Sequence, residues 1–281
     1  MNFETIEWEL KENGIGILTL KRPEKLNAIS FQMEEELHSI LDHLTMNLDC
    51  RVIILKGAGR GFCAGTDLQE GLILNSKKIQ EEYKKYYFLD VAEPIKKRVY
   101  YQWRISQLII KMRKISQPII ALIQGPAAGG GFSLILAADI RLASEEAQFI
   151  NSPINIGLTG ADIGASYFLP RLIGMSTAAE ILYTGRTVNG KEAKELGLVS
   201  KLVEKDKLLD AAMELAKEML KKSPLGLRMT KKALNLSLDS PSLDTIIQFE
   251  NSSQVVTFSS KDMNEASSAF FEKRDPKYSL K

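Results

Sequence analysis

Hydrophobic and polar positions alternate with a period of two at the start of the chain and then change to a helical period. Residues 5–23 alternate about the turn signal Glu12-Asn13-Gly14, which predicts a β-hairpin. Residues 30–47 carry apolar side chains at helical spacing, and Ser30 stands where its hydroxyl can cap the helix. The apolar run over residues 50–57 predicts a buried strand.

Strands and helices continue to alternate through the middle of the chain. Such alternation is typical of βαβ units and indicates an α/β fold with a mainly parallel sheet. The predicted elements are a helix over 100–114, a strand over 117–125, a helix over 131–138 and a strand over 139–144.

Beyond residue 177 the pattern is almost entirely helical, most clearly over residues 208–222 and 225–238. We therefore expect an α/β core over residues 1–200, which holds the functional site, and a helical C-terminal region over residues 201–281.

Composition narrows the classes of function. The chain has 37 basic and 35 acidic residues, a formal net charge of +2, which gives no electrostatic basis for general binding to nucleic acid or to a membrane surface. No apolar run approaches the roughly 20 residues of a membrane span. Cys50 and Cys63 have no metal-ligand spacing, so we expect reduced thiols, no metal site and a cytoplasmic protein.

Two glycine-rich turns follow two predicted buried strands, over residues 61–67 and 125–131. In a parallel sheet both turns lie at the carboxyl ends of strands, where ligand crevices form. The second turn leads into a helix, so the amides near Gly130 are unpaired first-turn donors at the positive end of the helix dipole. Together the turns could offer two N–H groups to a developing oxyanion. Taken singly, either turn could be a tight structural junction, and no phosphate-loop motif is present.

Several motifs along the chain match those of a known protein family. The chain resembles the crotonase (enoyl-CoA hydratase/isomerase) superfamily over nearly its whole length. The matching segments, in the family's order, are LKRPEKLNAIS, GRGFCAGTDL, PIIALIQGPAAGGGFSLILAADIRLASEEAQF, IGLTGADIGASYFLPRLIG, LYTGRTVNGKEAKELGLVSKLV and ASSAFFEKRDPKY.

The resemblance implies a crotonase-type spiral of ββα units with a helical C-terminal trimerisation region, and an assembly into a homotrimer or hexamer. It implies an acyl-CoA thioester substrate, with coenzyme A as part of the substrate and no separate cofactor. By motif position, Thr66 and Gly130 supply the two backbone N–H groups that hold the thioester oxygen.

The sequence departs from the hydratases of this family at both catalytic glutamate positions, which are Ser133 and Pro153 here. Asp162 falls on the catalytic aspartate position of the dienoyl-CoA isomerase branch when aligned backward from FLPRLIG, although the register slips by one residue when aligned forward from Phe149. Asp162 also fits an N-cap of the following helix. Other acids that could reach the site, or be solvated surface charges, are Glu70, Glu81, Glu82 and Asp90.

The family's coenzyme A contacts match further positions. Lys25 and Ala28 lie in the segment that holds the adenine, Ala64 lies in the first glycine-rich turn, and Lys273 matches a position that approaches the nucleotide phosphates.

A single carboxylate suits proton transfer between carbons better than addition of water, so we favour double-bond isomerisation. Two alternatives remain open: an enoyl-CoA hydratase with a non-standard acid, and a non-catalytic acyl-CoA-binding protein of the same fold. A serine hydrolase is disfavoured because the chain has no G-x-S-x-G motif and only two histidines, His38 and His43, on one predicted helix.

Overall fold

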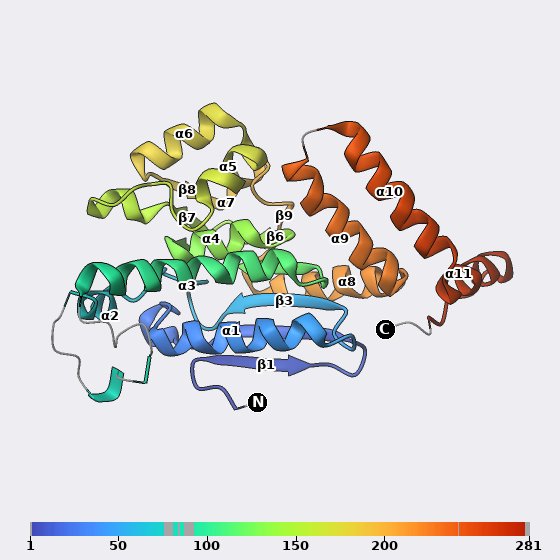
Figure 1. Cartoon of the computed structure of the whole chain (residues 1–281), viewed down its shortest axis with the longest axis horizontal. Coiled ribbons are helices and arrows are strands. Elements are labelled where there is room, and N and C mark those ends of the chain that lie inside the picture. Colours follow the sequence, from blue (N-terminus) through green and yellow to red (C-terminus); the bar gives the residue numbers. More distant parts are fainter. Residues whose placement is uncertain (1, 76–80, 84, 87–92, 241, 279–281) are drawn as a thin grey trace.

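A six-stranded sheet in the order β1-β2-β3-β4-β6-β9 runs through the computed structural model, which describes residues 2–75, 81–83, 85–86, 93–240 and 242–278 (Figure 1). The β1–β2 pair is antiparallel, which confirms the predicted hairpin, and all other neighbours are parallel. The strands are β1 (Ile6–Leu10), β2 (Ile15–Leu20), β3 (Val52–Gly57), β4 (Ile119–Ile123), β6 (Ile140–Ala143) and β9 (Lys201–Leu202).

Successive residues of β3 and β4 point into different hydrophobic clusters. Ile53 and Leu55 pack with helices α1 (Phe31–Met46) and α3 (Pro94–Lys114) on one face of the sheet. Val52 and Ile54 pack with α8 (Leu208–Leu220) on the other face. Burial on both faces explains why these strands appear in the sequence as unbroken apolar runs.

A smaller three-stranded sheet continues from the main one. It consists of β5 (Pro126–Ala128), β7 (Gln148–Ile150) and β8 (Thr187–Asn189), with β5 and β7 parallel. Since β5 follows β4 after only Gln124 and Gly125, the chain turns from one sheet into the other directly before the triple glycine.

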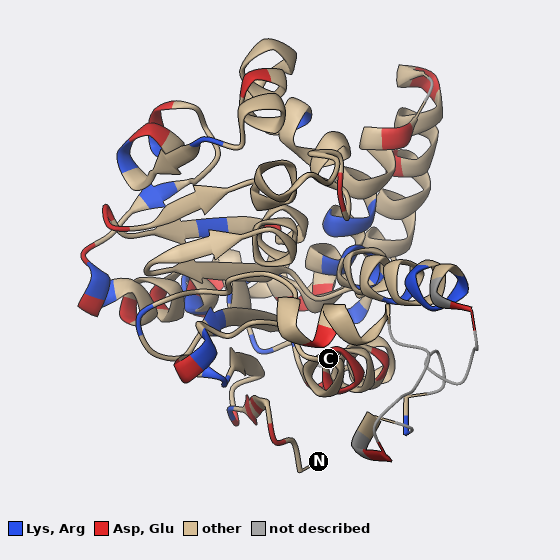
Figure 2. Cartoon of the chain, turned by 90° about the vertical axis from the view of Figure 1, so that its left-hand side faces the viewer, with Lys and Arg blue, Asp and Glu red and all other residues tan. Residues whose placement is uncertain are grey.

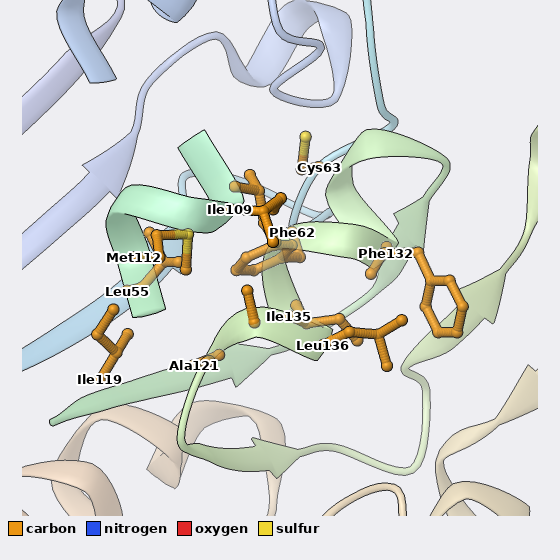
Figure 3. Packing of buried hydrophobic residues seen from close by; sticks show 14 of the residues in the cluster. Leu55, Phe62, Cys63, Ile109, Met112, Ile119, Ala121, Phe132, Ile135 and Leu136 are labelled. Atoms are coloured by element: carbon orange, nitrogen blue, oxygen red, sulfur yellow. The ribbon is translucent and has the colours of Figure 1, made fainter. Parts of the chain in front are cut away.

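Packing of Phe62 fixes the first glycine-rich turn on the core. Phe62 is fully buried and lies among Ile109 and Met112 of α3 and Ile135 of α4 (Gly130–Ala137), as Figure 3 shows. Burial of such a side chain stabilises the fold by about 1.5–3 kcal/mol.

The α/β class and the helical C-terminal part are confirmed. Helices α9 (Pro224–Asp239) and α10 (Leu243–Phe258) pack against each other and stand to one side of the sheet (Figure 1). The remaining helices are α2 (Leu68–Ile73), α5 (Ala165–Ile173), α6 (Met175–Thr184), α7 (Gly190–Glu195) and α11 (Lys261–Glu272), with 3-10 turns at Pro23–Lys25, Glu81–Tyr83, Ser152–Ile156 and Lys205–Lys207.

The division at residue 200 stays a prediction. Both β9 and α8 follow that residue, and they pair with β6 and pack on the main sheet respectively. The helices that leave the sheet therefore begin with α9.

Acidic and basic residues are interspersed along the helices, strands and loops of the chain in Figure 2. Within the described residues, no helix has both the length and the apolar character that crossing a lipid bilayer requires. Cys50 and Cys63 are both free and buried, and burial raises the pKa of each thiol to about 12. Both cysteines are therefore protonated, unreactive thiols at neutral pH.

Candidate active site

The two glycine-rich turns lie side by side. Cys63 and Ala127 form a parallel bridge, in which Cys63 N–H donates to Pro126 O (3.1 Å) and Ala128 N–H donates to Cys63 O (2.9 Å). The first turn therefore runs as a short strand beside β5. This arrangement, between residues more than sixty positions apart, brings Thr66 to the start of helix α4.

The orientation of Thr66 follows from its neighbours. Ile29 N–H donates to Gly65 O (2.7 Å) and Asp67 N–H donates to Ile29 O (2.9 Å), so both flanking residues bond toward Ile29. In an extended segment successive peptide groups point to opposite sides, and the Thr66 N–H therefore points away from Ile29.

Gly129 is the N-cap of α4 and has a φ of +50°, a left-handed conformation that favours glycine. Gly130 is the first helical residue, so its N–H has no intrahelical acceptor. The next position admits no side chain, because a methyl group on Gly131 would lie 2.2 Å from Cys63 O. The predicted helix start at the triple glycine is confirmed.

The Thr66 and Gly130 amides are neighbours. A methyl group on Gly130 would lie 3.7 Å from Thr66 N, and one on Gly65 would lie 3.2 Å from Gly130 N. Among the hydrogen bonds of the described residues, none is donated by either amide. Two unengaged N–H groups at the positive end of α4 can stabilise a negatively charged oxygen.

Asp67 holds this loop in place. Its carboxylate caps α2 by accepting a hydrogen bond from Gln69 N–H (3.0 Å), and it pairs with the Arg22 guanidinium at 3.2 Å. Arg22 also donates to Ala28 O (2.7 Å). One ion pair therefore links the segment before α1 to the turn that carries Thr66. Arg22 was not among the predicted site residues, because no local sequence pattern marks its distant partner Asp67.

The two hydratase glutamate positions contain no ionisable group. Ser133 is buried in α4, and its hydroxyl donates to the carbonyl oxygen of Asp162 (3.4 Å). Pro153 is buried in the 3-10 turn Ser152–Ile156. Ser152 lies against the triple glycine, because a methyl group on Gly129 would lie 2.9 Å from Ser152 Oγ.

The interpretation of Asp162 as an N-cap is wrong. Helix α5 begins at Ala165, its N-cap is Gly164, and no side chain caps it. Ile163 and Gly164 both have left-handed φ angles, +43° and +88°, which place Asp162 outside the capping position. Its carboxylate instead accepts a hydrogen bond from Gln102 Nε2 of α3 (2.7 Å).

The Asp162 carboxyl group is partly buried, and the main-chain carbonyl of the same residue contacts Ser133 in the first turn of α4. Burial raises its pKa above the ordinary value, although the hydrogen bonds from Gln102 and from Ile163 N–H act in the opposite direction. A carboxylate with a raised pKa is suited to accept and return a proton.

Three of the four residues predicted to contact coenzyme A come together. Ala64 N–H donates to Leu26 O (2.9 Å), and Ala28 N–H donates to Lys25 O (3.0 Å), so these residues lie beside the turn that carries Thr66. Lys25 Nζ donates to Gln69 Oε1 (3.0 Å) and forms no ion pair within the described residues.

Lys273 lies apart from this group. It follows the end of α11 in the left-handed conformation, and Figure 1 shows α11 and α2 on opposite sides of the molecule. Among the described residues, no hydrogen bond or ion pair connects Lys273 with the segment that contains Lys25 and Ala28.

The other candidate acids fall into two groups. Glu70 accepts a hydrogen bond from Phe31 N–H (2.6 Å) at the start of α1, and Glu81 is exposed. Asp90 and the side chain of Glu82 lie outside the described residues. Among the described residues, no cluster of histidine, cysteine, aspartate and glutamate has the arrangement of a metal site.

Known proteins share this chain's sequence over most of its length. The family model described as "Enoyl-CoA hydratase/isomerase" matches residues 10–281. A Mycobacterium leprae protein named "Probable enoyl-CoA hydratase" is 37% identical over 261 residues, which cover 92% of this chain and 85% of that protein. The 1,2-epoxyphenylacetyl-CoA isomerase of Escherichia coli is 32% identical over 270 residues, which cover 96% and 97% of the two chains.

The fold agrees with these relatives. The crystal structure of an enoyl-CoA hydratase from Bacillus anthracis matches with a TM-score of 0.85 and 32% identity, over 98% of this chain and 99% of that one. The resemblance in the sequence motifs is thereby confirmed, and the chain belongs to the enoyl-CoA hydratase/isomerase family of acyl-CoA enzymes, the crotonase superfamily.

Proposed function

We propose that this enzyme moves the double bond of an enoyl-CoA by proton transfer through a thioester enolate. The Thr66 and Gly130 N–H groups bind the enolate oxygen, and Asp162 takes the proton from one carbon and returns it to another. The observation that carries this proposal is the pair of adjacent amides, neither of which donates a hydrogen bond within the described residues.

The reaction needs no co-reactant. For a 3-enoyl-CoA, Asp162 removes a proton from the carbon next to the thioester, and the electron pair moves onto the thioester oxygen. The dienolate then takes the same proton at its far end, so the double bond becomes conjugated with the thioester. Since the proton is returned and no electrons are gained or lost overall, coenzyme A as part of the substrate is sufficient and no separate cofactor is required.

The residues at the hydratase positions favour isomerisation over hydration. A hydratase must activate a water molecule and also protonate carbon, whereas Ser133 and Pro153 offer no carboxylate for either step. The carboxylate of Asp162 can instead carry one proton from one carbon of the substrate to another. The names of relatives do not decide between the two reactions, because one is a 1,2-epoxyphenylacetyl-CoA isomerase and another a probable enoyl-CoA hydratase.

Coenzyme A is held, in this proposal, by Lys25, Ala28 and Ala64 from the chain that carries the amide pair. The Lys25 ammonium group, which forms no ion pair within the described residues, suits a nucleotide phosphate or the adenine edge. Lys273 follows α11, which lies on the opposite side of the molecule from α2 in Figure 1, so it would serve the site of a neighbouring subunit.

An assembly into a homotrimer or hexamer belongs to the same proposal. Helices α10 and α11 expose large apolar side chains, among them Val255, Phe258, Phe270 and Phe271. An exposed apolar surface of this kind marks a contact with another chain. The cytoplasmic location expected from the sequence remains part of this proposal.

The test compares crotonyl-CoA and a 3-enoyl-CoA as substrates for the wild type and for Asp162→Asn. We expect isomerisation of the 3-enoyl-CoA, with kcat reduced about 10²- to 10⁴-fold in the variant. Asp206→Asn, in an exposed turn, is the matched control and should retain wild-type activity.

Two results would overturn the proposal. Hydration of crotonyl-CoA as fast as isomerisation would identify a hydratase with a non-standard acid. Binding of acyl-CoA without turnover of either substrate would identify a protein that has kept the site and lost the reaction.

A further inference from the structure

A side chain from a distant helix donates a hydrogen bond to the Asp162 carboxylate. Gln102 lies on α3, 60 residues before Asp162 in sequence, and its amide Nε2 lies 2.7 Å from Asp162 Oδ1. The distance is short for a hydrogen bond from nitrogen to oxygen and is in the range of bonds to a charged acceptor.

The main chain of Asp162 is fixed by other contacts. Its carbonyl oxygen accepts hydrogen bonds from Ala165 N–H (2.8 Å) and from the Ser133 hydroxyl (3.4 Å). Ser133 thus supports the loop from the position at which the hydratases of this family carry an acid. These contacts locate the residue but leave the direction of its side chain open.

We propose that Gln102 is a positioning residue, whose amide holds the Asp162 carboxylate in one orientation and stabilises its charged form. This inference rests on the proposed function, in which Asp162 moves the proton. A base with a fixed orientation reacts faster because the favourable geometry is set before the substrate binds.

The Gln102 contact matters because burial and hydrogen bonding have opposite effects on the pKa of the Asp162 carboxyl group. Burial raises the pKa of the carboxyl group, and the Gln102 hydrogen bond is the first of two contacts that lower it again, the other being Ile163 N–H. Without Gln102 the charged form would lose its side-chain donor and keep the effect of burial.

The charged and titratable groups near Asp162 do not take the place of Gln102. From α3 the buried Tyr101 hydroxyl interacts with Asp162, and burial together with nearby acids raises the pKa of Tyr101, so it stays neutral when the carboxyl group titrates. The contact from α4 is the uncharged Ser133 hydroxyl. Among the described residues, no lysine, arginine or histidine forms an ion pair with Asp162.

Gln102 is exposed, so its replacement should not prevent folding. Gln102→Met keeps the length of the side chain and removes the donor. Gln102→Glu places a second carboxyl group beside Asp162. Gln107→Met is the matched control, because Gln107 is on the same helix and makes no hydrogen bond with Asp162 within the described residues.

The experiment measures the pH dependence of kcat for isomerisation in the full-length protein. A base must be deprotonated to act, so activity falls on the acid side of its pKa. We expect the acid limb to move upward by about one pH unit in Gln102→Met and further in Gln102→Glu, since like charges that share a site raise a pKa. Gln107→Met should keep the wild-type profile.

The outcomes separate this inference from the proposed function. Full activity of Asp162→Asn would mean that another group is the base, and the proposed function would fail. Loss of activity in Asp162→Asn, together with an unmoved acid limb in both Gln102 variants, would overturn the positioning role alone. A uniform loss of kcat at every pH, with lowered thermal stability, would also overturn it, because that pattern indicates a purely structural residue.

Discussion

Gly130 and Gly131 differ in the space that surrounds them, although they are neighbours in one helical turn. A methyl group on Gly130 would have ordinary contacts, at 3.4 Å from Ile29 Cδ1 and 3.7 Å from Thr66 N. A methyl group on Gly131 would lie within 2.2 Å of the Cys63 carbonyl oxygen, which the bridge to β5 fixes. Gly130 thus leaves space beside the two amides, and Gly131 allows the two glycine-rich turns to approach each other closely.

This difference predicts opposite effects of two alanine substitutions. Gly130→Ala should fold with the same or a slightly higher melting temperature, because alanine favours a helix by about 1 kcal/mol over glycine. Its methyl group lies beside Thr66 N, where the proposed enolate oxygen binds, so kcat should fall about 10²-fold or more. Gly131→Ala should unfold at a clearly lower temperature. Melting curves and isomerase rates check both, and wild-type activity in Gly130→Ala would contradict the role of the amide pair.

Helix α1 and strand β1 are joined by one buried carboxylate. Glu36 of α1 accepts hydrogen bonds from Glu4 N–H (2.8 Å), Thr5 N–H (2.9 Å) and Ile6 N–H (3.1 Å), which lead into β1. Burial acts to raise the pKa of Glu36, yet the hydrogen bonds from Glu4, Thr5 and Gln32 prevail and lower it below its ordinary value. Strand β1, at the edge of the sheet, is thus held by Glu36 of α1 as well as by its pairing with β2.

Glu36→Gln should therefore destabilise the protein by roughly 2 kcal/mol at pH 7, since hydrogen bonds to a charged group are the strong ones. A folded-state pKa below the unfolded value of about 4.3 means that this stabilisation is present above that pH. It is lost as the pH falls through the lowered pKa, so the difference between variant and wild type should shrink in acid. Urea unfolding at several pH values measures it.

The control for this prediction is Glu7→Gln. Glu7 forms an exposed pair with Lys21 (3.1 Å), and such a pair contributes less than about 1 kcal/mol. A Glu36→Gln variant no less stable than Glu7→Gln would show that pairing with β2 alone holds β1.

The main sheet is covered by helices on both faces, whereas the C-terminal helices from α9 onward pack little against it. Helix α8 buries its apolar face against β3 and β4, whereas α10 leaves Val255, Val256 and Phe258 more than half exposed. Apolar surface of this extent is unfavourable in water unless another chain covers it. The physical properties of the C-terminal helices therefore fit the proposed assembly.

Phe258→Asp tests that assembly. The side chain is 67% exposed in the single chain, so the substitution should leave the fold of the monomer intact. A charge in an apolar contact between subunits should shift the protein toward the monomer, as sedimentation velocity would show. Tyr183→Asp, which replaces an 80% exposed aromatic residue of α6, is the matched control and should keep the wild-type mass. A wild type that sediments as a monomer would contradict the proposal.

Local pattern alone predicted the elements whose periodicity is strong. The hairpin over residues 5–23, the helix capped by Ser30 and the buried strands β3 and β4 are all present. Helix α3 begins at Pro94 rather than near residue 100, because the polar first turns of the helix have no clear apolar period. Motif order also identified the family, since several specific segments had to occur in one sequence.

What the sequence by itself determined is therefore the set of elements, the triple-glycine helix start and the family. The tertiary structure decided which distant groups meet: Thr66 beside Gly130, Arg22 beside Asp67, and Gln102 on the Asp162 carboxylate. It also placed Asp162 outside the cap of α5, and it placed α11, which Lys273 follows, on the opposite side of the molecule from α2. The physical reason is that periodicity and capping depend on neighbours within a few residues, whereas these contacts join segments that only the packing of the sheets brings together.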